Sequence, residues 1–466
     1  MAAPSHATRA VPAPAPATRD TFASTLGAFT ATVGSAIGLG NIWKFPYLTG
    51  SNGGAAFVIT YLLAVALVGL PVMVVEHVIG RRMRLDAVRA YGKVVPNQPF
   101  WSAIGWAGLA SAILIMAFYT DVAGWVFAYV FKSAAALAAG RTLTPETFGA
   151  LASGTVEPLL WQLGVLVLTT SIIAAGVSGG IEKATKALMP LLFALLLVCD
   201  FRALTLPGSS AGVSYLFRPD LSKLSGAVLL SALGLAFFKL SLGMGTMTTY
   251  GSYLPDRVRI VPNAARVALA DTAISLLAGL AIFPAVFAFG GTPAGGPGLL
   301  FVTIPLIFSK MPLGGLFTVV FFILTSVATI GAMVSLIEVP VAWLVEKGHV
   351  RRPVAAALTG ATMFGLGVTA TLSQSPVLAS VKPFGKNFFD LYDFLSSNVL
   401  LPVGGLAITI VGGWLVSRTD FMQELDKGYA GAPWHARILY GFVRYVSPVL
   451  ILLILLSSLG AIGPSK

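Results

Sequence analysis

The chain is poor in charged residues and almost devoid of cysteine. Of its 466 residues, 10% are charged and 56% hydrophobic, and the mean hydropathy is +0.86. This composition excludes an ordinary soluble globular protein and predicts a membrane protein with many spans. The single cysteine, Cys199, lies within an apolar run, so a disulfide framework and a cysteine metal site are both excluded.

Signatures of covalent chemistry are also lacking. The histidines His6, His77, His349 and His435 are scattered along the chain, and no nucleophile triad or metal cluster is apparent. The glycine-rich runs do not follow strands, which argues against phosphate binding. We therefore expect no enzyme activity and no cofactor, and no metal beyond a possible sodium ion.

The net charge of +12 comes from basic residues in short loops between apolar runs. They follow the second, fourth, sixth, eighth and tenth runs, so these loops are predicted to be cytosolic. We expect the protein to lie in a lipid bilayer and not to bind nucleic acid. The N-terminus is then cytosolic, and an odd number of spans places the C-terminus outside. Residues 1–20, rich in Ala and Pro without an apolar core, predict a disordered cytosolic tail rather than a signal peptide.

Long apolar runs predict an all-α polytopic fold with about eleven transmembrane helices. The expected spans are Phe22–Phe45, Ala55–Gly80, Trp101–Phe131, Leu159–Ala175, Lys186–Leu204, Leu224–Tyr253, Val267–Phe289, Gly314–Val345, Pro353–Leu372, Phe389–Val416 and Ile438–Leu459.

Two of these runs are interrupted by residues that disfavour a continuous helix. The stretch from Val33 to Tyr47 contains Gly34, Gly38, Gly40 and Asn41, and the stretch from Ser241 to Thr246 reads SLGMGT. Broken backbone at bilayer depth is tolerated beside protein or a wet cavity, and two such breaks in corresponding places indicate a transporter binding site.

The spacing of the breaks predicts an inverted repeat of five plus five helices. The first repeat covers about 22–205 and the second about 224–416, each beginning with its broken helix, and an extra helix follows at about 438–459. We expect residues 21–466 to form a single transporter domain. The segment from Gly291 to Pro312, rich in Gly and Pro, is a candidate lid over an outer vestibule.

Six motifs, in order along nearly the whole chain, resemble the neurotransmitter:sodium symporter family. They are GSAIGLGNIWKFPY (34–47), NGGAAF (52–57), PVMVVEHVIGRR (71–82), FYTDVAGW (118–125), AFFKLSLGMGTMTTYGSY (236–253) and SLIEVP (335–340). The resemblance implies a bacterial inner-membrane transporter of eleven spans, similar to the leucine transporter, that works by alternating access.

The resemblance also implies a site for a small zwitterion such as an amino acid. Its residues would be Ser35, Ala36, Gly38, Gly40, Tyr119, Phe238, Ser241, Met244, Ala332 and Leu336. Without the motifs, Phe238, Met244 and Leu336 are ordinary core residues. Independently, a helix N-terminus favours a carboxylate, and Gly40 would allow close approach. The family's amine transporters carry an acidic residue at the position of Gly38, so its absence favours a substrate with its own carboxylate.

The family's gates map onto charged residues of this chain. Lys44 and Asp393 match the outer pair, while Arg19 and Glu346 match the inner pair, with Tyr253 beside it. The alternative is that each charge simply snorkels at a membrane interface.

The family's first sodium site is altered here. Ala36 and Asn41 are retained, but Lys239 replaces a hydroxyl or small polar residue and Asp271 replaces a carboxamide. A lone Lys at bilayer depth costs about 2.5–3.5 kcal/mol and needs a partner. We expect the Lys239 ammonium to occupy the place of sodium, accepted by Asp271, the Ala36 carbonyl and the Asn41 side chain; a static salt bridge is the alternative. A substrate carboxylate would leave one excess buried negative charge, which favours proton uptake.

The second sodium site also lacks ligands. Carbonyls align at Gly34, Ile37 and Ala328, but Gly331 and Ala332 stand where the family has hydroxyls, so sodium binding should be weak unless water or Thr329 helps. The usual chloride position keeps Tyr61 and Ser275 but has Leu235 and Lys239.

The sequence thus predicts a secondary transporter for an amino acid or similar zwitterion, with coupling to protons, weakly to sodium, or to neither. The alternatives are a sodium-coupled amino-acid symporter and a non-transporting substrate sensor. An enzyme is disfavoured because the signatures of covalent chemistry are lacking. A channel is disfavoured because no ring of repeated polar residues appears. The substrate, the coupling ion, chloride dependence and the oligomeric state stay open.

Overall fold

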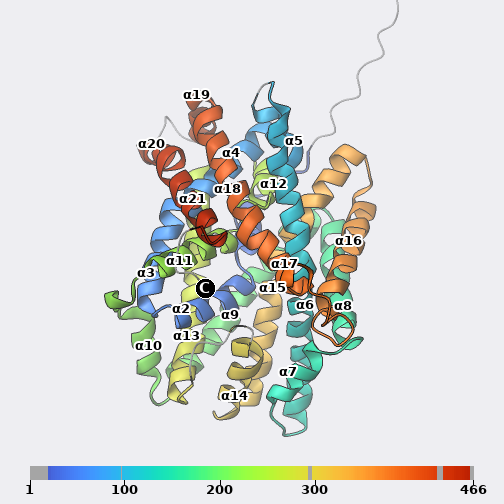
Figure 1. Cartoon of the computed structure of the whole chain (residues 1–466), viewed down its shortest axis with the longest axis vertical. Coiled ribbons are helices and arrows are strands. Elements are labelled where there is room, and N and C mark those ends of the chain that lie inside the picture. Colours follow the sequence, from blue (N-terminus) through green and yellow to red (C-terminus); the bar gives the residue numbers. More distant parts are fainter. Residues whose placement is uncertain (1–18, 96, 292–295, 297, 428–433, 462–466) are drawn as a thin grey trace, which may run out of the picture.

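A computed structural model describes residues 19–95, 97–291, 296, 298–427 and 434–461 (Figure 1). The predicted tail, 1–20, therefore lies outside the described residues except for Arg19 and Asp20. These two residues pair with Glu346 and Arg352, so ordered chain begins before the boundary that we predicted.

Helices lie at all eleven predicted spans, and the all-α fold class is confirmed. In the described part of the chain, nine helices are long and apolar enough to cross a membrane. They are Ala55–Met83 (α3, Ala55–Ala64, and α4, Leu70–Met83), Pro99–Ala138 (a 3-10 turn and α6, Ser102–Ala138), Glu157–Ala174 (α8), Val177–Leu204 (a π-helical turn and α9, Lys183–Leu204), Ile260–Ala288 (α13), Gly314–Gly348 (α15), Arg352–Leu372 (α16), Phe388–Leu415 (α17, Phe388–Asp393, and α18, Leu401–Ile410) and Trp434–Ser458 (α20, Trp434–Gly441, and α21, Ser447–Ser458).

The other two spans are the interrupted ones. The first consists of α1 (Thr25–Ala36), a π-helical turn (Gly40–Lys44) and α2 (Phe45–Ser51), so it continues past the predicted end at Phe45. Pro46 follows the π-helical turn directly, and such a local change of helix geometry accommodates a proline inside a membrane helix, because it helps to satisfy the backbone groups that the missing N–H frees. The second span consists of α11 (Gly226–Lys239) and α12 (Thr246–Tyr253).

Short helices that the apolar runs did not predict lie between the spans: α5 (Ala87–Val94), α7 (Pro145–Ala152), α10 (Ser209–Phe217), α14 (Ile304–Ser309) and α19 (Arg418–Asp426). α14, with the turn Leu299–Thr303 before it, forms part of the candidate lid; residues 292–295 and 297 of that segment lie outside the described residues. In Figure 1, α5 and α19 lie at one end of the molecule and α7 and α14 at the other.

The core is built around α15, which packs against α6, α9 and α1, while α12 packs against α4. Glycine allows these close approaches. A Cβ atom at Gly251 of α12 would come within 2.8 Å of the His77 Cα on α4. The broken helices are therefore enclosed by long continuous ones, and their interruptions lie in the protein interior.

At the end that carries α5 and α19, a buried arginine joins three segments. Arg81 of α4 is 1% exposed and bonds the carboxylate and the carbonyl of Glu424 on α19. Its third contact, 2.5 Å long, is to the Val258 carbonyl between α12 and α13. The guanidinium is thus satisfied, as burial of a charge requires.

Candidate functional site

At the first interruption, side-chain oxygens accept from backbone N–H groups that lie just before a helical segment. α1 ends at Ala36, and Ile37 is extended. The Gly38 N–H donates to Asn41 Oδ1 over 3.1 Å, and the Leu39 N–H donates to the Tyr119 hydroxyl over 3.1 Å. A side chain does not fit at Gly38, because a Cβ atom would stand 2.9 Å from both Ala332 Cβ and the Tyr119 hydroxyl.

The second interruption is shaped by left-handed backbone. Ser241, Gly243 and Gly245 have φ angles of 53°, 76° and 78°, a region that glycine adopts without strain. The Ser241 hydroxyl donates to the Ser35 carbonyl over 2.8 Å, which joins the two interruptions.

Glu76 of α4 fixes the start of α12, a role that our sequence reasoning missed. Its carboxylate accepts from the Gly243 N–H at 2.8 Å and from the Thr248 N–H at 3.2 Å. An acid at a helix N-terminus is favoured by the free N–H groups and the helix dipole. A lone Glu within an apolar span was the available signal.

One cavity lies between the interruptions, and all ten residues predicted for the substrate site line it, together with Ile115 and Lys239. Its volume is about 30 Å³, so Phe238 or another lining side chain has to move to admit a solute larger than water. Ile115 was missed, although it stands one helical turn before Tyr119 and so shares its face of α6.

A buried ion pair adjoins this cavity. The Lys239 ammonium lies 3.1 Å from Asp271 Oδ2, and both side chains are fully buried. The ammonium also bonds the Tyr61 hydroxyl at 2.8 Å and the Ser275 hydroxyl. Tyr61 in turn donates to Asp271 Oδ2 over 2.8 Å. The pair is thus enclosed by further hydrogen bonds, as a buried ion pair needs.

Two of the acceptors expected for Lys239 differ. The Asn41 amide donates to Asp271 Oδ1 over 2.7 Å, while its oxygen accepts from Gly38. An amide oxygen engaged in this way leaves Asn41 to contact the carboxylate rather than the ammonium. Tyr61 and Ser275, retained from the chloride position, contact the ammonium in place of Asn41 and the Ala36 carbonyl.

The second cation position is tightly packed. A Cβ atom at Gly331 would come within 2.6 Å of the Gly34 carbonyl oxygen. The nearby hydroxyls bond to carbonyls of their own helix: Thr329 donates to Ser326, and Thr325 donates to Phe321. The Thr329 hydroxyl is therefore already engaged. Gly331 and Ala332 have no side-chain oxygen that could join the carbonyls of Gly34, Ile37 and Ala328 as cation ligands.

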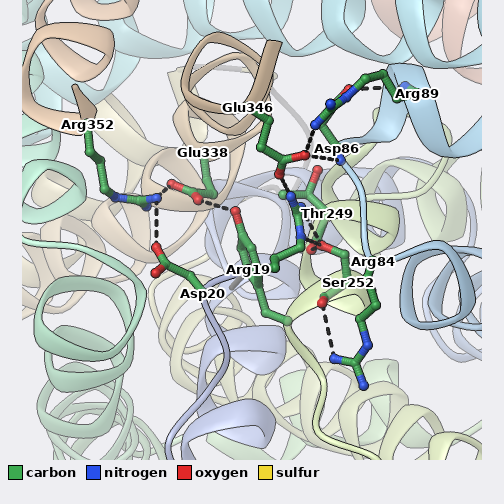
Figure 2. Close-up of polar contacts among 11 residues, drawn as sticks. Arg19, Asp20, Arg84, Asp86, Arg89, Thr249, Ser252, Glu338, Glu346 and Arg352 are labelled. Carbon is green, nitrogen blue, oxygen red and sulfur yellow. Dashed lines mark hydrogen bonds and ion pairs between the residues drawn. The ribbon is translucent and has the colours of Figure 1, made fainter. Parts of the chain in front are cut away.

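At the end that carries α5, charged side chains surround a cavity of about 350 Å³ (Figure 2). Glu346 pairs with Arg19 and Arg89, and it accepts the Asp86 N–H at 3.0 Å. Burial lowers the pKa of Arg19, but Tyr253, Asp86 and Glu338 oppose that effect. Arg19 also lies 4.7 Å from the centre of the Tyr253 ring. The predicted inner pair is thus in contact.

A second carboxylate in this network was missed. Glu338 accepts the Tyr253 hydroxyl at 2.6 Å and pairs with Arg352 at 2.5 Å, and Arg352 also reaches Asp20 at 3.4 Å. Glu338 lies inside the motif SLIEVP, so its acidic character was visible, but its partner on α16 was not.

The predicted outer pair is apart. Within the described ranges, no ion pair joins Lys44 to Asp393: Lys44 lies 4.1 Å from the centre of the Phe238 ring, and Asp393 accepts from Ser397 at 2.8 Å. The side of the cavity near Phe238 is therefore covered by an aromatic ring and its cation rather than by a salt bridge.

Two interrupted helices around a central cavity, with ion pairs at one end, define a secondary transporter of the membrane. The chain belongs to the sodium:neurotransmitter symporter family, whose match covers residues 19–142 and 151–466. This is a family of transporters, not of enzymes.

Individual relatives agree with this assignment. An uncharacterized sodium-dependent transporter of Bacillus subtilis, YhdH, is 38% identical over 95% of this chain and 98% of its own length. The bovine sodium- and chloride-dependent taurine transporter is 27% identical over 90% of this chain and 75% of its own. The crystal structure of MhsT in complex with L-phenylalanine matches with a TM-score of 0.86 and 41% identity, covering 94% of this chain and 100% of MhsT.

Proposed function

We propose that this transporter moves an amino acid or a similar small zwitterion by alternating access, with the Lys239 ammonium in the place of the first sodium ion. The observation that carries the proposal is the fully buried Lys239–Asp271 pair beside the cavity. The names of two relatives support the substrate class, since MhsT was solved with L-phenylalanine and the bovine relative is a taurine transporter.

The chemistry of the lining fits a carboxylate. The Tyr119 oxygen accepts from Leu39, which leaves the phenol proton free to donate to a ligand. The start of the helical segment at Gly40 adds a partial positive charge. Ile115, Met244 and Leu336 offer an apolar surface to the rest of the solute.

The balance of charges around the cavity suggests which ion is coupled to transport. Lys239 and Asp271 sum to zero, so an incoming carboxylate adds one uncompensated negative charge, whose burial is costly. We infer that Asp271, or the pair together with the substrate, takes up a proton when substrate binds. The alternative is sodium coupling, which the names of the sodium-dependent relatives favour. A sensor that does not transport is the third reading, and the closed contact of Arg19 with Glu346 speaks against it.

Purified protein in vesicles tests these readings. With L-phenylalanine and taurine as probes, we expect counterflow of at least one, with uptake that responds to an imposed pH gradient and only weakly to a sodium gradient. The variant Lys239→Thr with Asp271→Asn serves as the matched control, because it removes both charges. Uptake that follows sodium alone would support the symporter alternative, while binding without counterflow would support a sensor.

A further inference from the structure

A buried carboxylate outside the cavity has no place in this mechanism. Asp121 lies on α6, two residues after Tyr119, and is fully buried. Neither of its oxygens has a hydrogen-bond partner of good geometry among the described residues. An ionised carboxylate in such a place is costly, and ionisable residues inside a membrane are commonly functional.

The surroundings of Asp121 are polar but uncharged. Thr371 of α16 lies close enough to interact with its carboxyl, and no charged group in the described part of the chain perturbs it. Most titratable and charged groups of α6 and the neighbouring helices are engaged elsewhere: Tyr119 with Leu39, Lys132 with Glu157, Tyr91 with Thr248, Arg352 with Glu338 and Asp20, Glu346 with Arg19 and Arg89, Tyr392 with Thr369, and Asp393 with Ser397. The Tyr129 hydroxyl, two turns further along α6, is buried and has no hydrogen-bond partner among the described residues.

The direction of the nearby hydrogen bonds fixes which group must donate. The Thr120 hydroxyl donates to the Met116 carbonyl at 2.7 Å, so it accepts from the Gln162 amide at 2.9 Å. The Gln162 oxygen accepts from the Thr371 hydroxyl at 3.3 Å. Thr371 has then used its single proton and is left only with acceptor capacity toward Asp121.

Tight packing argues against a metal ion as the neutralising charge. Glycines bring α6 and α16 against Gln162: a Cβ atom at Gly124 would lie 3.0 Å from the Gln162 backbone nitrogen, and one at Gly367 would overlap the Gln162 side chain. A hard cation needs a fuller shell of oxygens than one carboxylate and one hydroxyl. A proton needs only one acceptor.

We propose that Asp121 is a proton-binding site within the membrane, distinct from Asp271, and that its protonated carboxyl donates to Thr371 where α6, α8 and α16 meet. Loss of the proton leaves a buried charge on the helix that holds Tyr119 against Leu39. Alkaline pH should therefore loosen α6 behind the substrate cavity.

The sign of the pH effect is fixed. The folded state holds a proton that the unfolded chain releases above about pH 3.9, the ordinary Asp value. Stability therefore falls as pH rises, by about a tenfold increase in the unfolding constant per pH unit for one proton, until the folded carboxyl itself ionises. Asp121→Asn stays neutral and still donates, so it should lack this contribution.

The experiment compares thermal unfolding of the full-length protein and Asp121→Asn between pH 6 and 9, in potassium and in sodium buffers. We expect the wild-type melting temperature to fall more steeply with pH, while the exposed control Asp390→Asn keeps the wild-type slope. In parallel, the infrared carbonyl band of a protonated carboxyl should be present in the wild type and missing in Asp121→Asn.

Equal slopes and identical infrared bands in the wild type and Asp121→Asn would overturn the proposal. Stabilisation of the wild type by sodium at fixed pH, lost in Asp121→Asn, would also overturn it in favour of a metal cation. If Asp121→Asn does not fold, Thr371→Val removes the acceptor instead; a shifted carbonyl band supports the proposal, and an unchanged one contradicts it.

Discussion

The two positions where this family is expected to hold sodium have been altered in opposite ways. At the first, a tethered ammonium contacts three polar side chains, those of Asp271, Tyr61 and Ser275, and all three are buried. At the second, hydroxyls are missing and the Gly331 backbone lies against the Gly34 carbonyl. The first position is thus occupied by a charged side chain and the second by close packing, and we expect the two to respond differently to mutation.

The largest effect is expected from breaking the first position. Asp271→Asn leaves the Lys239 ammonium buried without its counter-charge, which should destabilise the protein by about 3–5 kcal/mol. Thermal unfolding measures the loss. A variant as stable as the wild type would mean that Tyr61 and Ser275 suffice for the ammonium.

The double variant Lys239→Thr with Asp271→Asn sharpens the same comparison. Both charges disappear together, so the loss should be clearly smaller than for Asp271→Asn alone. Because a hydroxyl and a carboxamide return beside Asn41, we also expect sodium to raise the melting temperature relative to potassium, as a ligand of the folded state does. An unchanged response to sodium would indicate that the remaining oxygens do not form an ion site.

At the second position, adding one methyl group to Gly331 tests whether the backbone is closely packed there. Gly331→Ala places its Cβ against the Gly34 carbonyl and should cost about 1–3 kcal/mol, as overpacking does. The matched control is Gly365→Ala on α16, where a Cβ meets nothing within 4 Å. There we expect a gain of about 0.5–1 kcal/mol from helix propensity. Chemical or thermal unfolding of the two variants should give opposite signs.

The smallest effect is expected for an ion pair outside the spans. Asp256 contacts Arg84 at 2.9 Å and Lys427 at 3.3 Å but is largely exposed. Partial burial opposes ionisation, yet Lys427 and Arg84 prevail and lower the pKa of Asp256. Its stabilisation is therefore present above the ordinary Asp value and lost as pH falls through the folded value. Asp256→Asn should cost no more than about 1 kcal/mol at neutral pH, which unfolding at pH 7 and at pH 3 measures.

Much of the fold could be predicted because lipid demands long apolar runs, and all eleven spans follow from them. The short helices α5, α7, α10, α14 and α19 could not, since they carry no run of that length. Glycine spacing predicted both interruptions. The complementary changes at residues 239 and 271 predicted their contact.

Side-chain direction limited the rest of the site. The sequence indicates that Asn41 and Lys239 lie near Asp271. It does not indicate that Asn41 bonds one carboxylate oxygen while Lys239 contacts the other. The Phe238 ring beside Lys44 and the Arg352 partner of Glu338 depend on rotamers and on helix packing over long separations. Their roles, like those of the other predicted site residues, remain proposals for the variants above to test.

Arg81 has a mechanical consequence. The Arg81 guanidinium bonds both Glu424 and the Val258 carbonyl. It therefore links α4, α19 and the connection after α12 into one rigid unit. If the protein works by alternating access, these three segments move together, and any hinge that opens the end carrying α5 and α19 lies elsewhere in the chain.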